Sequence, residues 1–134
     1  MIKETLTYTD YSGTKREEDF FFNLTQVEWI RVSAKCGGDI RAFVAKCVRE
    51  NDLSSMLEFI ETLVQTAYGE KSPDGRRFIK SDEVLESFIR TEAYNDFVIS
   101  LFTDANKATN FFNKLVPKEL PADVKAPSSI SIVE

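Results

Sequence analysis

The first part of the chain alternates between apolar and polar residues, which is the pattern of a strand with one buried face. Ile2 to Thr9 alternates in this way, and Asp10-Tyr11-Ser12-Gly13 reads as a turn in which Gly13 takes a positive φ. The segment Thr14 to Phe22 returns as a second strand, with charged residues first and Phe20-Phe21-Phe22 last. An isolated hairpin is marginal in water. We therefore predict that this one packs on helices or pairs with another chain, and that its ladder is strongest near Phe20 to Phe22.

After the predicted hairpin, the apolar spacing changes to that of helices. Thr25 and Glu28 have the spacing of a capping box, so the first helix begins there and runs to about Lys35. Its apolar residues fall on two faces, which indicates either burial from two sides or one exposed patch. Further helical stripes extend to Pro117, and they are interrupted by predicted breaks and caps at Gly37-Gly38, Asn51-Asp52, Tyr68-Gly69, Ser81, Thr91 and Asp104.

The segment from Tyr68 to Ser81 separates two of these stripes and has turn residues of its own. Gly69 suits a left-handed residue just past a helix end, and Pro73-Asp74-Gly75 is a turn signal. One interpretation is a helix–turn–helix connector anchored by Phe78. The other is a recognition surface, because four cations gather in one loop of a net-acidic protein: Lys71, Arg76, Arg77 and Lys80.

These patterns predict an α+β, mainly α protein. It has an N-terminal β-hairpin over residues 2–22, followed by a compact bundle of about five or six short helices over residues 25–116. The length of 134 residues suits one domain, which we place at residues 1–117. Residues 118–134 are expected to form a flexible tail, because few apolar groups remain to offset the ordering entropy. Ile130-Ser131-Ile132-Val133 is a β-prone exception that suits pairing with a sheet edge.

Composition narrows the function classes. A net charge of −5 disfavours binding to duplex nucleic acid. Eleven phenylalanines indicate either a phenylalanine-rich core or an apolar surface meant for a partner. Cys36 and Cys47 are expected to be reduced, buried packing residues of a cytosolic chain, since neither a signal peptide nor a membrane span is recognisable.

The chemistry needed for catalysis is missing from the sequence. The chain has no histidine, so a Ser or Cys nucleophile lacks its usual base and a metal lacks its commonest ligand. Neither a Cys-x-x-Cys motif nor a calcium-loop spacing occurs. We therefore expect no catalytic residue, no metal, no cofactor and no enzymatic activity.

The run Ala67 to Ser81, followed by Phe88 and Thr91-Glu92-Ala93-Tyr94, resembles the tail assembly chaperones of siphovirus-type bacteriophages. The strand pair ending in Phe20 to Thr25 is similar to the opening of that family. The resemblance implies a small non-catalytic protein of the host cytoplasm that coats and solubilises the tape measure protein, helps recruit tail tube subunits, and is absent from the mature virion. It leaves open self-association and a longer frameshifted product, for which Val116-Pro117-Lys118 is a compatible slip site.

With this resemblance, the expected partners are the tape measure protein and the tail tube protein, with no nucleic acid and no membrane. Candidate partner-binding residues come from the central loop and from two aromatic positions outside it: Tyr68, Lys71, Asp74, Arg76, Arg77, Phe78, Lys80, Trp29 and Phe21. Alternative functions are a small nucleic-acid-binding phage protein and an inhibitory phage protein directed at one host target.

Overall fold

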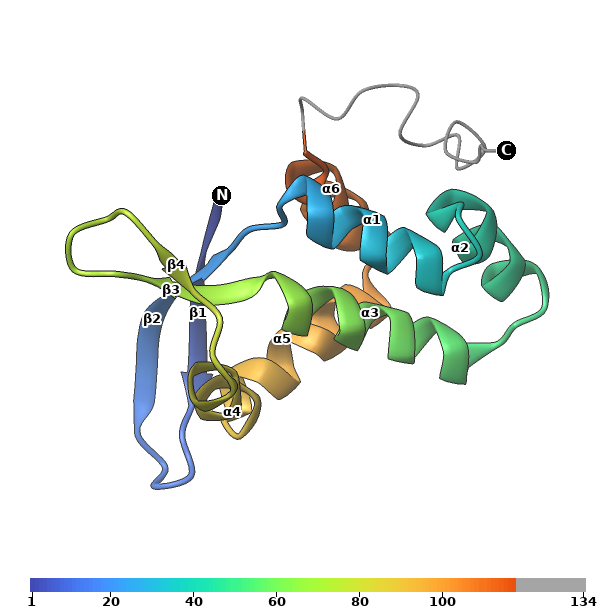
Figure 1. Ribbon diagram of the computed structural model, residues 1–134. Helices are drawn as coiled ribbons and strands as arrows, with labels where there is room; N and C mark the ends of the chain where they lie inside the picture. Colours follow the sequence, from blue (N-terminus) through green and yellow to red (C-terminus); the bar gives the residue numbers. More distant parts are fainter. Residues whose placement is uncertain (118–134) are drawn as a thin grey trace.

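The computed structural model describes residues 1–117, and the expectations for residues 118–134, including the Ile130–Val133 patch, lie outside this part. The described part combines one four-stranded sheet with six helices, α1 to α6. Figure 1 shows the sheet at one end of the molecule and most of the helices extending away from it. The predicted α+β, mainly α class with an N-terminal hairpin is confirmed.

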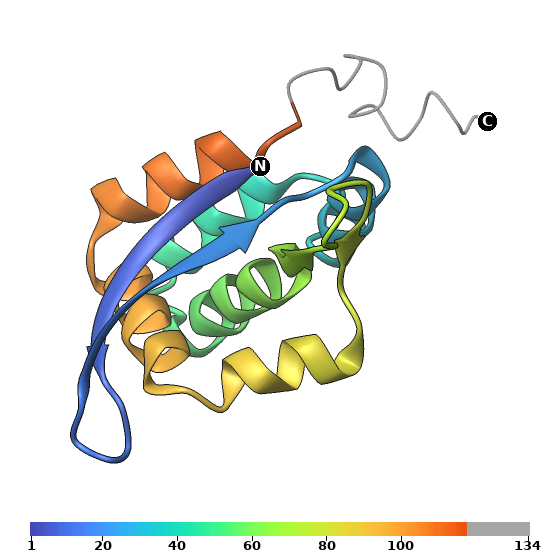
Figure 2. The same cartoon turned by 90° about the vertical axis from the view of Figure 1, so that its left-hand side faces the viewer.

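The N-terminal hairpin consists of β1 (Ile2–Thr9) and β2 (Lys15–Phe22). The strands pair from Ile2 opposite Phe22 to Thr9 opposite Lys15, so the ladder continues into the charged half instead of being concentrated near Phe20 to Phe22. Gly13 has the predicted positive φ, at 86°. The tip of this hairpin extends beyond the helices (Figures 1 and 2).

The central segment is a second hairpin, so the predicted helix–turn–helix connector is wrong. Its strands are β3 (Tyr68–Lys71) and β4 (Phe78–Ile79), and the sheet order is β1-β2-β3-β4, antiparallel throughout. Gly69 is not a left-handed residue past a helix end. It lies in β3 opposite Phe21, and the ring of Phe78 covers it so closely that a Cβ there would lie 2.6 Å from the ring. Long-range pairing with β2 sets the conformation of Tyr68 and Gly69 at the start of this hairpin.

Each helix begins at a residue whose side chain accepts a hydrogen bond from the first-turn backbone, as the sequence predicts. Thr25 and Glu28 form the complete capping box at the start of α1. The helices and their N-caps are α1 (Gln26–Lys35, Thr25), α2 (Ile40–Arg49, Asp39), α3 (Leu53–Ala67, Asp52), α4 (Asp82–Ile89, Ser81), α5 (Glu92–Thr103, Thr91) and α6 (Ala105–Leu115, Asp104).

Aromatic rings form the centre of the core, where the inner face of the sheet meets the helices. Phe22 is fully buried and contacts the rings of Tyr68, Phe88, Phe97 and Phe111 at centroid distances of 5.4 to 6.0 Å. These rings come from β3, α4, α5 and α6, so this cluster joins the sheet to three helices. The high phenylalanine content was explained above by either a phenylalanine-rich core or an apolar partner surface. The structure supports the phenylalanine-rich core.

The two apolar faces of helix α1 were expected either to be buried from two sides or to leave one exposed patch. Val32 is buried, whereas Val27 and Ile30 are 57% and 45% exposed. The structure therefore has one exposed patch on this helix. Cys36 and Cys47 are free thiols, the first half-buried and the second buried, and burial raises the pKa of both.

Candidate partner-binding site

The residues singled out from the sequence divide into structural residues and exposed residues. Tyr68 is buried, and its ring stacks on Phe88 at 4.2 Å. Burial, together with the nearby Glu70 carboxylate, raises the pKa of Tyr68 to about 12. Trp29 is half-buried against Phe112 at 5.5 Å. Both side chains therefore hold elements together, and little of either is available to a partner.

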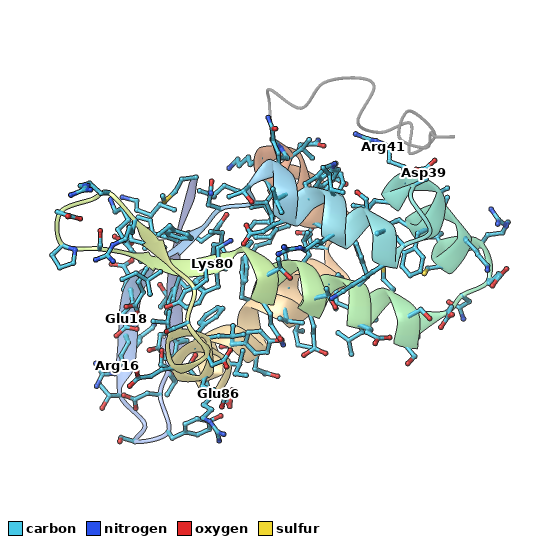
Figure 3. The ribbon with its side chains drawn as sticks, in the orientation of Figure 1. Arg16, Glu18, Asp39, Arg41, Lys80 and Glu86 are labelled. Carbon is cyan, nitrogen blue, oxygen red and sulfur yellow. The ribbon has the colours of Figure 1, made fainter. Side chains whose placement is uncertain are left out.

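Lys80 also holds the fold together, because its ammonium group lies where three segments meet. It donates to Glu28 Oε1 at 2.6 Å, to the carbonyl of Asn23 at 2.6 Å and to the carbonyl of Thr66 at 2.9 Å. These acceptors belong to α1, to the link between β2 and α1, and to the last turn of α3. Figure 3 shows Lys80 at this junction between the sheet and the helices. Lys80, one of the predicted recognition cations, therefore forms a bridge between elements.

The turn of the second hairpin is organised by Ser72 and Asp74. Ser72 is buried, and its hydroxyl donates to Asp74 Oδ1 at 2.6 Å and accepts from the backbone N–H of Arg77 at 3.0 Å. Asp74 Oδ1 also accepts from the N–H of Arg76 at 3.1 Å. These bonds lower the pKa of Asp74, and the hydrogen bond from the Ser72 hydroxyl has the largest effect. Asp74 therefore stabilises the turn, and it presents the neighbouring arginines to solvent.

The remaining candidates form one surface, which we call the outer-sheet patch: Phe21, Lys71, Arg76, Arg77 and Phe78. Phe21 and Phe78 are half-buried on the sheet face opposite the helices, on either side of Gly69. Lys71 lies over the Phe21 ring with its Nζ 4.9 Å from the centroid. Arg76 and Arg77 are exposed beyond it, and within residues 1–117 Arg77 makes no ion pair. This patch offers cations beside aromatic rings, which suits an acidic or aromatic partner surface.

A larger apolar surface lies at the other end of the molecule and was missed by the sequence reasoning. It is a groove of about 640 Å³ formed by α2, α3, the end of α5 and α6, and we call it the helical groove. Its lining is mainly apolar and includes Val44, Val48, Leu53, Met56, Ala108 and Phe112. Val48 and Leu53 at its mouth are 68% and 58% exposed.

Small side chains contribute to the lining of the helical groove. Ala105 and Ala108 line it from α6. Arg41 lines the helical groove, and its guanidinium carbon lies 5.8 Å from the centroid of the Phe112 ring. The available sequence signal was the pair of alanines in the stripe of α6, together with Val48 and Leu53 flanking a helix break. The helical spacing of apolar residues assigns such residues to the core, and it does not distinguish those that remain exposed to solvent.

Within residues 1–117 no group of three or more Cys, Asp and Glu side chains is arranged to hold a metal ion. No helix in the same part of the chain has the length and apolar character to span a bilayer. What the structure presents is a pair of exposed surfaces, one apolar and one cationic with aromatic rings.

These features define a small, mainly helical protein whose candidate site is a surface for another protein. Comparison with family models identifies which class of binding protein it is. The model of the phage tail assembly chaperones matches residues 1–131, and the chain belongs to that family. Neither the curated proteins nor the solved structures gave a match. The family implies a non-enzymatic role with phage tail proteins as partners.

Proposed function

We propose that this chain binds the tape measure protein during tail assembly, keeps it soluble in the host cytoplasm, and helps recruit tail tube subunits. The observation that carries the proposal is the helical groove in a member of the tail assembly chaperone family. A tape measure protein is a long, largely helical chain, and its apolar stripes need cover until the tube surrounds it. The chaperone itself leaves when the tube is complete, so it is absent from the virion.

The groove supports helix binding by its shape and its composition. A volume of about 640 Å³ takes several side chains, and an amphipathic helix inserts anchors spaced i, i+3 or i+4, and i+7 into such a groove. The mouth residues Val48 and Leu53 extend the apolar surface to the rim, where they can cover the client helix beyond its anchors. Many weak contacts of this kind along one client give avidity without a single tight site.

The outer-sheet patch supports a second contact that is independent of the first. It lies on the β3–β4 hairpin, at the end of the molecule away from α2 in Figure 1. A chaperone bound to the tape measure protein through the groove therefore still presents Lys71, Arg76 and Arg77. We assign this patch to the recruitment of tail tube subunits.

Co-expression with the tape measure protein of the same genome tests the proposal. The measurement is the fraction of that client in the soluble lysate, with and without the chaperone. Val48→Asp puts a charge at the groove mouth, and Val27→Asp is the matched control because it changes an exposed helical valine outside the groove. We expect the unmodified chain and Val27→Asp to keep the client soluble and Val48→Asp to lose this effect.

Two results would contradict the proposal. If the client precipitates equally with and without the chaperone, the function is wrong. If Val48→Asp retains the client and Val27→Asp loses it, the exposed patch on α1 is the binding surface and the groove is not. Tight binding of duplex DNA at physiological salt would instead favour the nucleic-acid alternative.

A further inference from the structure

The helical groove has a direction, because its charged side chains lie at opposite ends of one wall. Helix α2 forms this wall, from Arg41 through Val44 to Val48. Within residues 1–117 only two charged residues line the groove, Arg41 in the first turn of α2 and Asp52 just beyond its last turn. At about 1.5 Å per residue α2 is about 15 Å long, so the two charges are separated by roughly this distance.

The negative end of the groove is already used by the fold. Asp52 caps α3, and its carboxylate accepts from the backbone N–H of Ser55 at 3.1 Å. Hydrogen bonding to Ser55 lowers the pKa of Asp52, with a smaller contribution from the charge of Lys46. Asp52 is therefore ionised at neutral pH, and its charge disfavours an acidic side chain of a client at this end.

The positive end, in contrast, has an arginine without a carboxylate partner. Within residues 1–117 Arg41 makes no ion pair. The nearest acid in the sequence is Asp39, whose carboxylate caps α2 by accepting from the N–H of Ala42 at 3.1 Å. In Figure 3 the Arg41 side chain extends away from Asp39. Arg41 is exposed, so its guanidinium is accessible to an acceptor on another molecule.

An aromatic ring of the opposite wall sets the position of this guanidinium. The Arg41 guanidinium carbon lies 5.8 Å from the centroid of Phe112 on α6. The Phe112 ring is half-buried and lies 5.5 Å from the ring of Trp29 on α1, so it is held in place from its other neighbour. An arginine that rests on an aromatic ring keeps the N–H donors in its plane, and these donors bind a carboxylate in a bidentate way.

We propose that Arg41 selects the client of the helical groove by binding an acidic side chain that flanks the client's apolar anchors. This inference rests on the proposed function and adds the chemistry of the client to it. The occupant is an amphipathic helix with its apolar stripe along α2 and a glutamate or aspartate at the Arg41 end. A helix in the reverse direction brings the same carboxylate to the Asp52 end, where it is repelled. The groove therefore accepts one direction of the client helix.

Fluorescence anisotropy with three labelled peptides tests this assignment. Each peptide is a stapled helix of alanine and glutamine with leucines at i, i+4, i+7 and i+11. One has a glutamate a turn before the first leucine, one has it a turn after the last leucine, and the third has glutamine at both places. We expect one glutamate peptide to bind the unmodified chain about threefold to tenfold more tightly than the glutamine peptide, and the other to show no gain.

Substitutions of Arg41 show whether this side chain causes the preference. Arg41→Gln should abolish it, whereas Arg49→Gln should retain it. Arg49 is the matched control because it is an exposed arginine of the same helix, lies outside the groove lining and makes no ion pair within residues 1–117. Arg41→Glu should transfer the preference to a peptide with lysine in place of the glutamate. A role of Arg41 in folding alone would not produce this exchange of partners.

Each other outcome overturns the assignment. If neither glutamate peptide gains affinity, or if Arg41→Gln keeps the preference, Arg41 does not select the client. If both glutamate peptides gain equally, the groove has no direction. If no peptide binds while co-expression still keeps the tape measure protein soluble, the assignment of Arg41 is wrong and the proposed function acts through another surface. Precipitation of that client in the presence of the unmodified chain would contradict the proposed function itself.

Discussion

Replacing Lys80 by methionine tests whether the cation of the second hairpin is structural. The substitution keeps the length and the apolar stem of the side chain and removes the ammonium group. Three acceptors then lose their donor: the carboxylate of Glu28 and the carbonyls of Asn23 and Thr66. Two of these bonds join residues more than fifty positions apart, with separations of 52 and 57 residues. Lys80→Met therefore weakens contacts between elements and leaves the local structure of the turn in place.

The size of the effect follows from the environment of the bridge. Removing a hydrogen bond to a charged group costs about 1.5–3 kcal/mol when its partner is left unsatisfied. The Lys80 and Glu28 side chains are each 21% exposed, so water can replace part of the lost hydrogen bonding. The total cost is therefore smaller than the sum of the costs of the three bonds. We expect the free energy of unfolding to fall by about 2–3 kcal/mol, which corresponds to about 10 °C in Tm for a chain of this size.

Urea unfolding followed by circular dichroism measures this change. Arg77→Met is the matched control, because it removes a cation from the same hairpin at an exposed position without an ion pair in residues 1–117. It should change the free energy of unfolding by less than about 0.5 kcal/mol. A double-mutant cycle with Glu28→Gln isolates the ion pair. If the free energy of unfolding of Lys80→Met lies within about 0.5 kcal/mol of that of the unmodified chain, Lys80 has no structural role.

Three further predictions test the hairpin and the core. Arg76→Ala combined with Arg77→Ala should leave the urea midpoint almost unchanged while partner binding in a pull-down falls; an unfolded double mutant would show that these cations are structural. Gly69→Ala should destabilise the fold by about 2–3 kcal/mol in the same urea assay, because its Cβ would lie 2.6 Å from the Phe78 ring and 2.8 Å from the carbonyl oxygen of Ile79; a neutral result would mean that β4 moves away at little cost. Burial, together with nearby carboxylates, raises the pKa of Tyr68 and of Tyr94 to about 12, so the stability that their neutral forms contribute is complete below pH 10 and is lost as the pH rises through 12. Tyrosine absorbance should show two groups ionising near 12 while the protein is folded, and ionisation of all four tyrosines near 10 in the folded protein would contradict this.

Local signals in the sequence were sufficient for the N-terminal hairpin and for the helix boundaries. The turn residues from Asp10 to Gly13 predict the positive φ of Gly13, and the Thr25–Glu28 capping box involves only residues within one turn. The bounds of α3 also follow from local features, since Asp52 caps its start and the apolar stripe continues to Ala67. Such elements can be predicted because their causes lie within a few residues of them.

The second hairpin could not be predicted in this way. The segment Tyr68-Gly69-Glu70-Lys71 has no clear alternation and follows a strong helical stripe, so Gly69 resembled a helix end. It becomes a strand because Tyr68 and Gly69 pair with Phe22 and Phe21, which lie almost fifty residues earlier. The role of Lys80 is non-local for the same reason. A loop rich in cations resembles a recognition surface until the acceptors that fold around it are known.

The distribution of aromatic and aliphatic residues supports the proposal that this chaperone binds its client without a tight site. Six phenylalanines are buried, among them Phe22, Phe88 and Phe97, so the stable body depends on rings that no partner reaches. The large apolar residues left exposed on its helices are aliphatic: Val27, Ile30, Val48, Leu53 and Ile99. Binding hot spots in tight interfaces are rich in Trp, Tyr and Arg, whereas aliphatic contacts are weaker and less demanding in geometry. A groove edged by Val48 and Leu53 therefore suits many similar apolar helical stripes in succession, as the proposed coating of a long client requires.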